Sequence, residues 1–386
     1  MAASRGVRHD SMRARNLAVA LDVIRHRGPL SRAALAEATG LTKTTVSKLV
    51  SDLLEAGAVT ELGAMRDGER GRPGVAVRLS GHRVAALGLE ANIGYLAACV
   101  VDLTRSVRVR RTRAVDNRNS RPEAVLAALR DLAEETMAEA GRAGLRLTGA
   151  ALAVPGPVAD GLLRNAPHLG WRDVRVSDLL GLPVQDGCFE VDNEANLAAL
   201  GELWFGSGAT DFLYVSGEIG IGAGLVVDGR VFRGTYGLAG ELGHVVVMPE
   251  GPSCRCGGRG CLEVYAGRDA LLGAADTIDD LVRLLKDGDE RALAGCERAG
   301  HALGVALTSA VHLMDPGRIV LGGIFAPLSP WLEDPVGQAL TARLGGLRGG
   351  TPQVTVSEIG ADAAVLGAAG LVIQRLLADP ARVLGL

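Results

Sequence analysis

The chain opens with short helical patterns of apolar residues. From Leu17 to Ile24, apolar positions recur every three or four residues, which predicts a helix over 15–27 that ends at a Gly-Pro pair. Ser31 then precedes a short second helix over 32–38 and is its expected N-cap.

A third helix is predicted from Thr42, as N-cap, to about Ala56. One stripe along it is apolar, formed by Val46, Leu49, Val50, Leu53 and Leu54. At about 100° per residue, the residues opposite or flanking that stripe are polar, namely Thr44, Thr45, Ser47, Lys48 and Ser51. Two short helices joined by a tight turn at 39–41, the second polar on its outer face, are typical of a helix-turn-helix.

Two further segments extend this pattern. Residues 58–62 and 75–79 have the composition of strands and flank the charged, glycine-rich loop 66–74, which reads as a wing. The alternative is a small helical bundle with a solvated polar face, which any three amphipathic helices can form. Helix lengths, wing and charge together favour binding to double-stranded DNA.

The charge distribution divides the chain in two. The 386 residues carry a net charge of −3, but residues 1–80 hold 13 Lys or Arg against 8 Asp or Glu, so a +5 head precedes a −8 body. We expect the acidic body to avoid the phosphate backbone. Aromatic residues make up only 3% of the chain, which argues against single-strand binding by ring stacking. No signal peptide and no apolar run of about 18 residues is evident, so we expect a cytoplasmic protein without a membrane segment.

From residue 84 onward, short apolar strands alternate with helices. Strands are predicted over 84–90, 95–102, 107–111, 147–154, 188–191, 212–216, 223–227, 230–232 and 318–321, with helices over 121–141, 194–205 and much of 269–315. This order predicts an α/β body, residues 81–386, of two similar lobes at about 81–193 and 194–386. Ligands in such folds bind in the cleft at the strand ends.

Three of the six cysteines fall within eight residues. Cys254, Cys256 and Cys261, separated by glycines, supply three ligands for a tetrahedral zinc, and His244 is the nearest candidate for the fourth. The alternatives are incidental thiols or a Cys254–Cys256 disulfide. A bridge across one residue is strained and the expected compartment is reducing, so we favour zinc.

Polar residues near this loop suggest a polyhydroxyl ligand. Glu241, His244 and Glu263 lie close to it in sequence, and Asn193-Glu194 opens a helix after a strand. Sugar hydroxyls both donate and accept hydrogen bonds, which such side chains match. Surface salt bridges would explain scattered carboxylates equally well, and the spacing does not decide between them. The glycine-rich run 216–224 suits either a phosphate loop or a tight turn, but it contains Glu218.

These segments together resemble the ROK family, which contains sugar kinases and transcriptional repressors, and in particular its repressors. The resemblance covers nearly the whole chain. The matching motifs are Val154-Pro-Gly-Pro-Val158, Ala166-Pro-His-Leu-Gly-Trp171, Asn193-Glu-Ala-Asn196, Gly220-Ile-Gly-Ala-Gly224, Glu241-Leu-Gly-His244 and Cys254-Arg-Cys-Gly-Gly-Arg-Gly-Cys-Leu-Glu263.

The resemblance implies an actin-like, ribonuclease-H-like body of two lobes with a sugar in the cleft. The implied sugar-binding residues are Gly156, Asn193, Glu194, Glu241, His244 and Glu263. The implied zinc ligands are His244, Cys254, Cys256 and Cys261. His244 would then bind the metal through one ring nitrogen and face the sugar with the other.

The chain departs from the kinase pattern at three places. The first strand ends in Glu90-Ala-Asn-Ile-Gly-Tyr95 where family kinases carry an Asp-x-Gly-Gly-Thr-Lys phosphate loop, Glu194 replaces the catalytic aspartate, and Glu218 lies in the second phosphate loop. Misplacing a general base by about 1 Å costs on the order of 10²-fold in rate, so we expect sugar binding without phosphoryl transfer. His168 stands where many members have Asn, which bears on the choice of sugar.

We therefore expect a DNA-binding repressor of carbohydrate genes, controlled by a sugar or sugar phosphate. The expected DNA-contacting residues are Lys43, Thr44, Thr45, Ser47 and Lys48 in the major groove and Arg72 in the wing. One helix reads too few base pairs for specificity, so a homodimer or a dimer of dimers is expected. The alternative is an active sugar kinase that carries a DNA-binding head.

Overall fold

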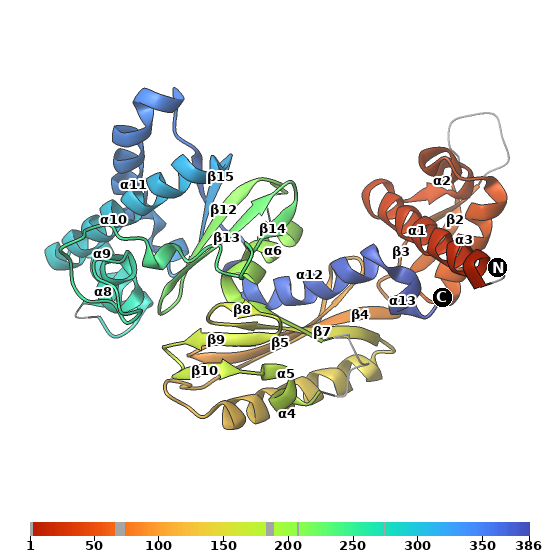
Figure 1. Cartoon of the computed structure of the whole chain (residues 1–386), viewed down its shortest axis with the longest axis horizontal. Coiled ribbons are helices and arrows are strands. Elements are labelled where there is room, and N and C mark those ends of the chain that lie inside the picture. Colours follow the sequence, from red (N-terminus) through yellow and green to blue (C-terminus); the bar gives the residue numbers. More distant parts are fainter. Residues whose placement is uncertain (1–2, 66–73, 183–188, 207, 274) are drawn as a thin grey trace.

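The computed structural model describes residues 3–65, 74–182, 189–206, 208–273 and 275–386. Figure 1 shows a small head at the right, formed by the described residues up to Leu79, and a body of two lobes, each built on a five-stranded sheet. Both termini lie beside the head.

The head is a winged helix-turn-helix, as predicted. Its elements are α1 (Ala3–Arg27), β1 (Leu30–Ser31), α2 (Arg32–Thr39), α3 (Lys43–Glu55), β2 (Val59–Met65) and β3 (Gly74–Leu79), with sheet order β1-β3-β2. The helix α1 begins twelve residues earlier than expected, because its polar first half gives no apolar periodicity. The strand β1 was not predicted, because its two residues are too few to show an alternating pattern.

Local capping fixes the turn between α2 and α3. The Ser31 hydroxyl accepts from the backbone N–H of Ala34 at 3.2 Å and caps α2. Gly40 then ends α2 in the left-handed region, at φ 68°. The hydroxyl of Thr42 caps α3 by accepting from the N–H of Thr45 at 3.2 Å. The orientation of α3 thus follows from local sequence.

The first lobe is a sheet between two layers of helix. Its strands are β4 (Val84–Ala91), β5 (Tyr95–Asp102), β6 (Val107–Ala114), β7 (Arg146–Val154) and β11 (Phe189–Asn193), in the order β11-β7-β4-β5-β6. The strand β7 runs parallel to β4 and β11, and β5 is antiparallel to both of its neighbours. One face is covered by α4 (Pro122–Arg142). The lobe also contains a small sheet of β8 (Val158–Ala159), β9 (Leu162–Ala166) and β10 (Trp171–Val174), and the helix α5 (Val176–Leu180), which packs on α4.

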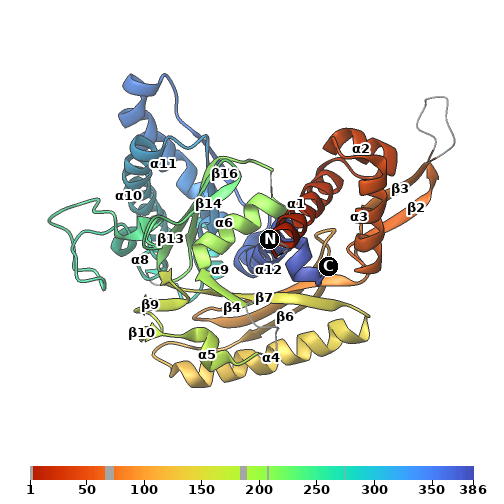
Figure 2. The same cartoon turned by 45° about the vertical axis from the view of Figure 1, so that its right-hand side comes forward.

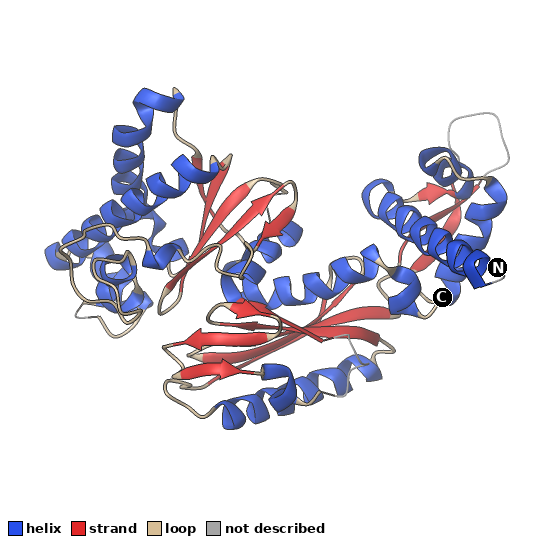
Figure 3. Ribbon diagram, viewed as in Figure 1, coloured by secondary structure: helices blue, strands red, loops and turns tan. Residues whose placement is uncertain are grey.

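The second lobe repeats this plan. Its sheet has the order β14-β13-β12-β15-β16, from β12 (Phe212–Gly217), β13 (Ile221–Val227), β14 (Arg230–Phe232), β15 (Arg318–Gly323) and β16 (Gln353–Val356). On one face lies α6 (Glu194–Phe205). The remaining elements are the short helix η1 (Leu242–His244), α7 (Glu263–Ala266), α8 (Arg268–Leu272), α9 (Ile278–Lys286), α10 (Glu290–Met314) and α11 (Phe325–Arg348). Figure 3 shows the two sheets (red) as separate layers with helices (blue) on their faces.

The last two helices contact the first lobe and the head. After η2 (Gly360–Asp362), α12 (Ala363–Ala378) lies across β4, β5 and β7 of the first sheet, and α13 (Pro380–Leu384) contacts α1 of the head. Figure 2 shows α12 above the first sheet and beside α1. The expected boundary between the lobes at residue 193 remains a prediction, and the C-terminal helices bridge both lobes and the head. These contacts join segments that are distant in sequence, so no local sequence pattern predicts them.

Residues 360–378 are long and apolar enough to cross a membrane by length and composition. Of that stretch, 67% is buried inside the protein. It contributes to the core shared by α6, α12 and the first sheet, so we interpret it as a core helix.

Candidate functional site

A cavity of about 210 Å³ opens between the two lobes. All six residues implied as sugar ligands line it: Gly156, Asn193, Glu194, Glu241, His244 and Glu263. Further polar side chains in the wall are Asn92, Asn165, His168, Glu218 and Arg255. The two lobes thus contribute donors and acceptors to a single space.

Asn193 ties this cavity to the start of α6. Its side-chain oxygen accepts from the N–H groups of Ala195 and Asn196 at 2.8 and 3.3 Å, so it is the N-cap of the helix. Its amide nitrogen donates to the carbonyl of Gly156 at 3.0 Å. Gly156 has φ 139°, and a Cβ there would lie 2.3 Å from the Asn165 carbonyl oxygen, so only glycine fits.

Both carboxylate oxygens of Glu263 have a partner at the cavity wall. One carboxylate oxygen lies 3.6 Å from Nε2 of His168, and the other accepts from the N–H of Ile221 at 3.3 Å. Burial raises the pKa of Glu263, but His168, His244 and the backbone bond outweigh it, so the net shift of the pKa is downward. The lowered pKa favours the ionised carboxylate at Glu263.

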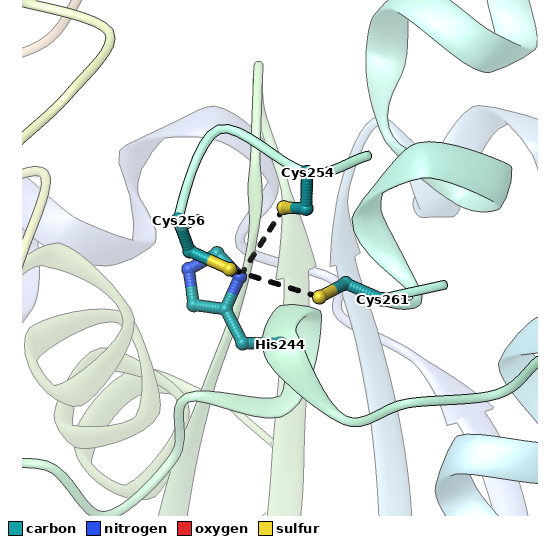
Figure 4. A group of neighbouring side chains, drawn as sticks. All are labelled: His244, Cys254, Cys256 and Cys261. Carbon is teal, nitrogen blue, oxygen red and sulfur yellow. Dashed lines mark hydrogen bonds between the residues drawn. The ribbon is translucent and has the colours of Figure 1, made fainter. Parts of the chain in front are cut away.

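His244 belongs to both the cavity and the cysteine loop. Its Nδ1 lies 3.8 Å from Sγ of Cys254 (Figure 4). Its Nε2 lies 3.9 Å from a Glu241 oxygen. Burial raises the pKa of Glu241, with His244 acting against that rise. One ring nitrogen thus points to the thiols and the other toward the cavity side.

The four predicted metal ligands form one cluster. The ligand atoms of His244, Cys254, Cys256 and Cys261 all lie within 4.8 Å of one another. Cys256 and Cys261 have their sulfurs 3.7 Å apart, close to the roughly 3.8 Å expected for two thiolates about 2.3 Å from one tetrahedral zinc. All three cysteines are free thiols, so the Cys254–Cys256 disulfide considered above is not formed. The cluster can hold a metal ion.

Three carboxyl groups meet beside this cavity. Glu194 and Glu218 line both this cavity and a smaller one of about 20 Å³, which Glu90 also borders. Glu90 accepts from the Tyr95 hydroxyl at 2.7 Å, yet its Oε2 and that of Glu194 have no hydrogen-bond partner among the described residues. Sequence reasoning noted these glutamates only as departures and did not foresee that they meet.

Burial governs how these three groups titrate. It raises the pKa of Glu90 to about 8 and that of Glu218 to about 7. It also raises the pKa of Glu194 well above its usual value, and Glu218 and Glu90 add to this rise by repulsion. Burial therefore favours the neutral acid at Glu90 and Glu194 near neutral pH.

The polar face of α3 is accessible. Lys43, Thr44 and Lys48 are exposed, whereas Thr45 and Ser47 are partly buried. The Thr45 hydroxyl lies 2.9 Å from the Thr42 hydroxyl, so one of its hydrogen bonds is made within the head. Arg72 lies outside the described residues.

Sequence reasoning missed several polar residues of the cavity wall. Asn92, Asn165 and Arg255 were not singled out as ligand residues, although they line the cavity. Arg255 stands between two predicted metal ligands, so its position inside the cysteine loop was the one available signal. Asn165 reaches the cavity only because β9 folds back beside Gly156.

Comparison with known proteins agrees with this arrangement. Residues 86–375 match the ROK family and residues 18–68 match the MarR family. The chain belongs to the ROK family. It is 28% identical to the xylose repressor of Bacillus subtilis over 373 residues, covering 94% of this chain and 96% of that protein.

Two solved structures describe the likeness in three dimensions. A ROK family transcriptional regulator homologous to the Escherichia coli MLC protein superimposes with a TM-score of 0.81 at 25% identity, covering 97% of this chain and 99% of that one. A ROK hexokinase from Thermus thermophilus gives a TM-score of 0.61 at 30% identity and covers 76% of this chain and 99% of that one. The predicted architecture, a winged helix-turn-helix on an actin-like ROK body, is confirmed.

Glu90→Gln is expected to reduce the loss of stability with rising pH. The folded chain holds the Glu90 proton to about pH 8, whereas the ordinary value is 4.5. The stability that this group contributes therefore falls as pH rises from about 4.5 to 8, and glutamine removes that fall. Thermal unfolding at pH 5.5 and pH 8 measures it: the Tm difference should shrink by several degrees. Exposed Glu250→Gln is the control, and an unchanged pH profile in Glu90→Gln would contradict the assignment.

Proposed function

We propose that this protein is a transcriptional repressor of carbohydrate-metabolism genes whose DNA affinity is controlled by a sugar bound between the lobes. The observation that carries the proposal is that one chain joins an accessible polar recognition helix to a cavity walled by carboxylates, amides and imidazoles. The similarity to a xylose repressor along nearly the whole chain supports this combination of a DNA-binding head and a ligand-binding body. The role implies a cytoplasmic protein.

In this proposal α3 enters the major groove. Lys43, Thr44, Thr45, Ser47 and Lys48 lie on its N-terminal half and present hydroxyl and ammonium groups to base edges and phosphates. Arg72 in the wing is proposed to reach the neighbouring minor groove. A homodimer or dimer of dimers would place two such helices on a two-fold symmetric site.

The sugar is proposed to lie against Gly156, Asn193, Glu194, Glu241, His244 and Glu263. Charged Glu263 suits an accepting role, while Glu194, whose raised pKa favours the neutral acid, can also donate to a hydroxyl. Two lobes that share one ligand gain contacts when they close on it, and this gives the sugar a differential affinity for two conformations.

We propose zinc as the resident metal of His244, Cys254, Cys256 and Cys261. Three thiols and one imidazole at this spacing fit a closed tetrahedral site, in which zinc supplies structure rather than reactivity. The loop holds His244 through Nδ1 and so orients its other nitrogen toward Glu241 and the cavity.

We propose that the chain does not transfer phosphoryl groups, although it shares the body of a ROK hexokinase. Catalysis of that reaction relies on cationic and backbone groups that stabilise phosphate charge. Here Glu90, Glu194 and Glu218 meet beside the proposed sugar site, and carboxyl groups supply no positive charge to a phosphate. An active kinase carrying a DNA-binding head is the alternative, and these carboxyls count against it.

Lys48→Ala is expected to weaken DNA binding about 5- to 150-fold, because one charged contact to the duplex is lost. The duplex is first selected from a random library with the wild-type protein, and affinity is then measured by fluorescence anisotropy at several salt concentrations. The salt slope should fall by about one. Lys286→Ala, exposed on α9 of the body, is the matched control. Equal affinity of Lys48→Ala and wild type would count against this helix as the reader of DNA.

A panel of monosaccharides is expected to contain at least one that raises the Tm. Ligand at about 100 times its Kd adds about 2.7 kcal/mol to the free energy of unfolding, which thermal shift detects. Glu241→Gln removes a cavity acceptor at nearly constant shape and should abolish the shift, while Glu250→Gln should retain it. A panel of pentoses, hexoses and N-acetylhexosamines without any shift would overturn the sugar-binding proposal.

The purified protein is expected to contain one zinc per chain by inductively coupled plasma mass spectrometry. Cys256→Ser should lower both zinc content and Tm, because metal binding energy contributes to folding. Cys296→Ser, at a buried cysteine on α10 outside the cluster, should keep its zinc. Metal-free wild-type protein purified without chelator would contradict the assignment.

A further inference from the structure

Trp204, near the end of α6, lies where the head and both lobes meet. Its ring is packed under the Arg25 guanidinium of α1 at 4.1 Å and lies 5.4 Å from that of Arg105, in the turn between β5 and β6. Arg105 also donates to the Trp204 carbonyl at 2.7 Å. With only 4% of its surface exposed, Trp204 joins second-lobe helix α6 to the first lobe through Arg105 and to the head through Arg25.

The opposite end of the same helix lies in the proposed sugar cavity. Asn193 caps α6 and Glu194 is its first residue, and both line the cavity. The helix has 12 residues, or about 18 Å at 1.5 Å per residue. Every residue from Ala195 to Glu202 is buried, so α6 is packed along most of its length.

Between these ends, α6 crosses α12 at very short range. A Cβ on Gly201 would lie 2.2 Å from the Ala363 carbonyl oxygen, and one on Gly367 would lie 1.7 Å from the Leu197 carbonyl oxygen. The helix α6 packs on β12 and β13 of the second lobe, whereas α12 packs on the first sheet. The crossing of α6 and α12, seen in Figure 1, is therefore a contact between the two lobes. On α6, Gly201 lies between Glu194, which lines the cavity, and Trp204.

Favourable and unfavourable interactions oppose each other where Arg25 contacts Trp204. A guanidinium over an indole face is stabilising by about 0.5–2 kcal/mol. Against this, burial lowers the pKa of Arg25, and the like charge of Arg105 lowers it further. The Nε of Arg25 is buried without a hydrogen-bond partner among the described residues. A small displacement of the ring can therefore change the preferred position of Arg25.

We propose that α6 is the lever that couples sugar binding to the DNA-binding head. Closure of the lobes on a sugar turns α6 about its glycine crossing with α12, which displaces Trp204 relative to Arg25 and Arg105 and reorients α1. The inference rests on the function proposed above and identifies the residues through which its regulation acts.

The first experiment observes Trp204 directly in the full chain. The sequence has three tryptophans, so Trp171→Phe with Trp331→Phe leaves Trp204 as the only one. A monosaccharide that raises the Tm of this variant is expected to shift or quench its emission as the guanidiniums move. The matched variant that keeps only Trp331, on α11, should show no change. Unchanged Trp204 emission under saturating sugar would overturn the lever.

The second experiment measures coupling. In Arg25→Met, sugar affinity should stay within about twofold of wild type, while the effect of sugar on affinity for the selected duplex should shrink at least fivefold. Arg25→Lys keeps a cation and should restore part of the effect, and Arg27→Met, exposed on the same helix, should behave as wild type. Full coupling in Arg25→Met would overturn the inference. Failure of every sugar to bind even the wild type would instead overturn the proposed function, and the lever with it.

Discussion

The contact of α6 with α12 is the constraint on which the rest of the body depends. At Gly201 and Gly367 the helix backbones approach so closely that neither position has room for a side chain. Since one helix lies on the second sheet and the other on the first, this contact sets the angle between the lobes and the width of the cavity. The same α12 leads into α13, which contacts the head, so the position of the recognition helix depends on the same contact.

The head and the cysteine loop could be predicted because their information is local. Ser31, Gly40 and Thr42 fix two helices and the turn between them through contacts within a few residues. The cysteine cluster was equally accessible, since three of its four ligands come from one loop and glycines let that loop fold back. The six implied sugar ligands rested on resemblance to a family, and the structure brings all six to one cavity. The roles assigned to them remain predictions.

What the sequence did not disclose depends on long-range packing. Nothing in residues 363–378 indicates that this helix returns to the first sheet, because it is apolar on most sides and fits any core. The meeting of Glu90, Glu194 and Glu218 likewise requires strand β4, helix α6 and the turn after β12 to converge. Nor does a formal count of −3 reflect how these buried carboxyls titrate, since it assumes that each is ionised at pH 7.

His244 has a consequence for how such a chain can diverge. It is shared by the cysteine cluster and the cavity wall, so a substitution there alters the fold of the loop and the ligand contacts at once. Asn165, His168 and Arg255 line the same cavity without belonging to the cluster. Substitutions at these three positions can therefore change the cavity wall and leave the four clustered side chains in place, which separates the evolution of the cavity from that of the cluster.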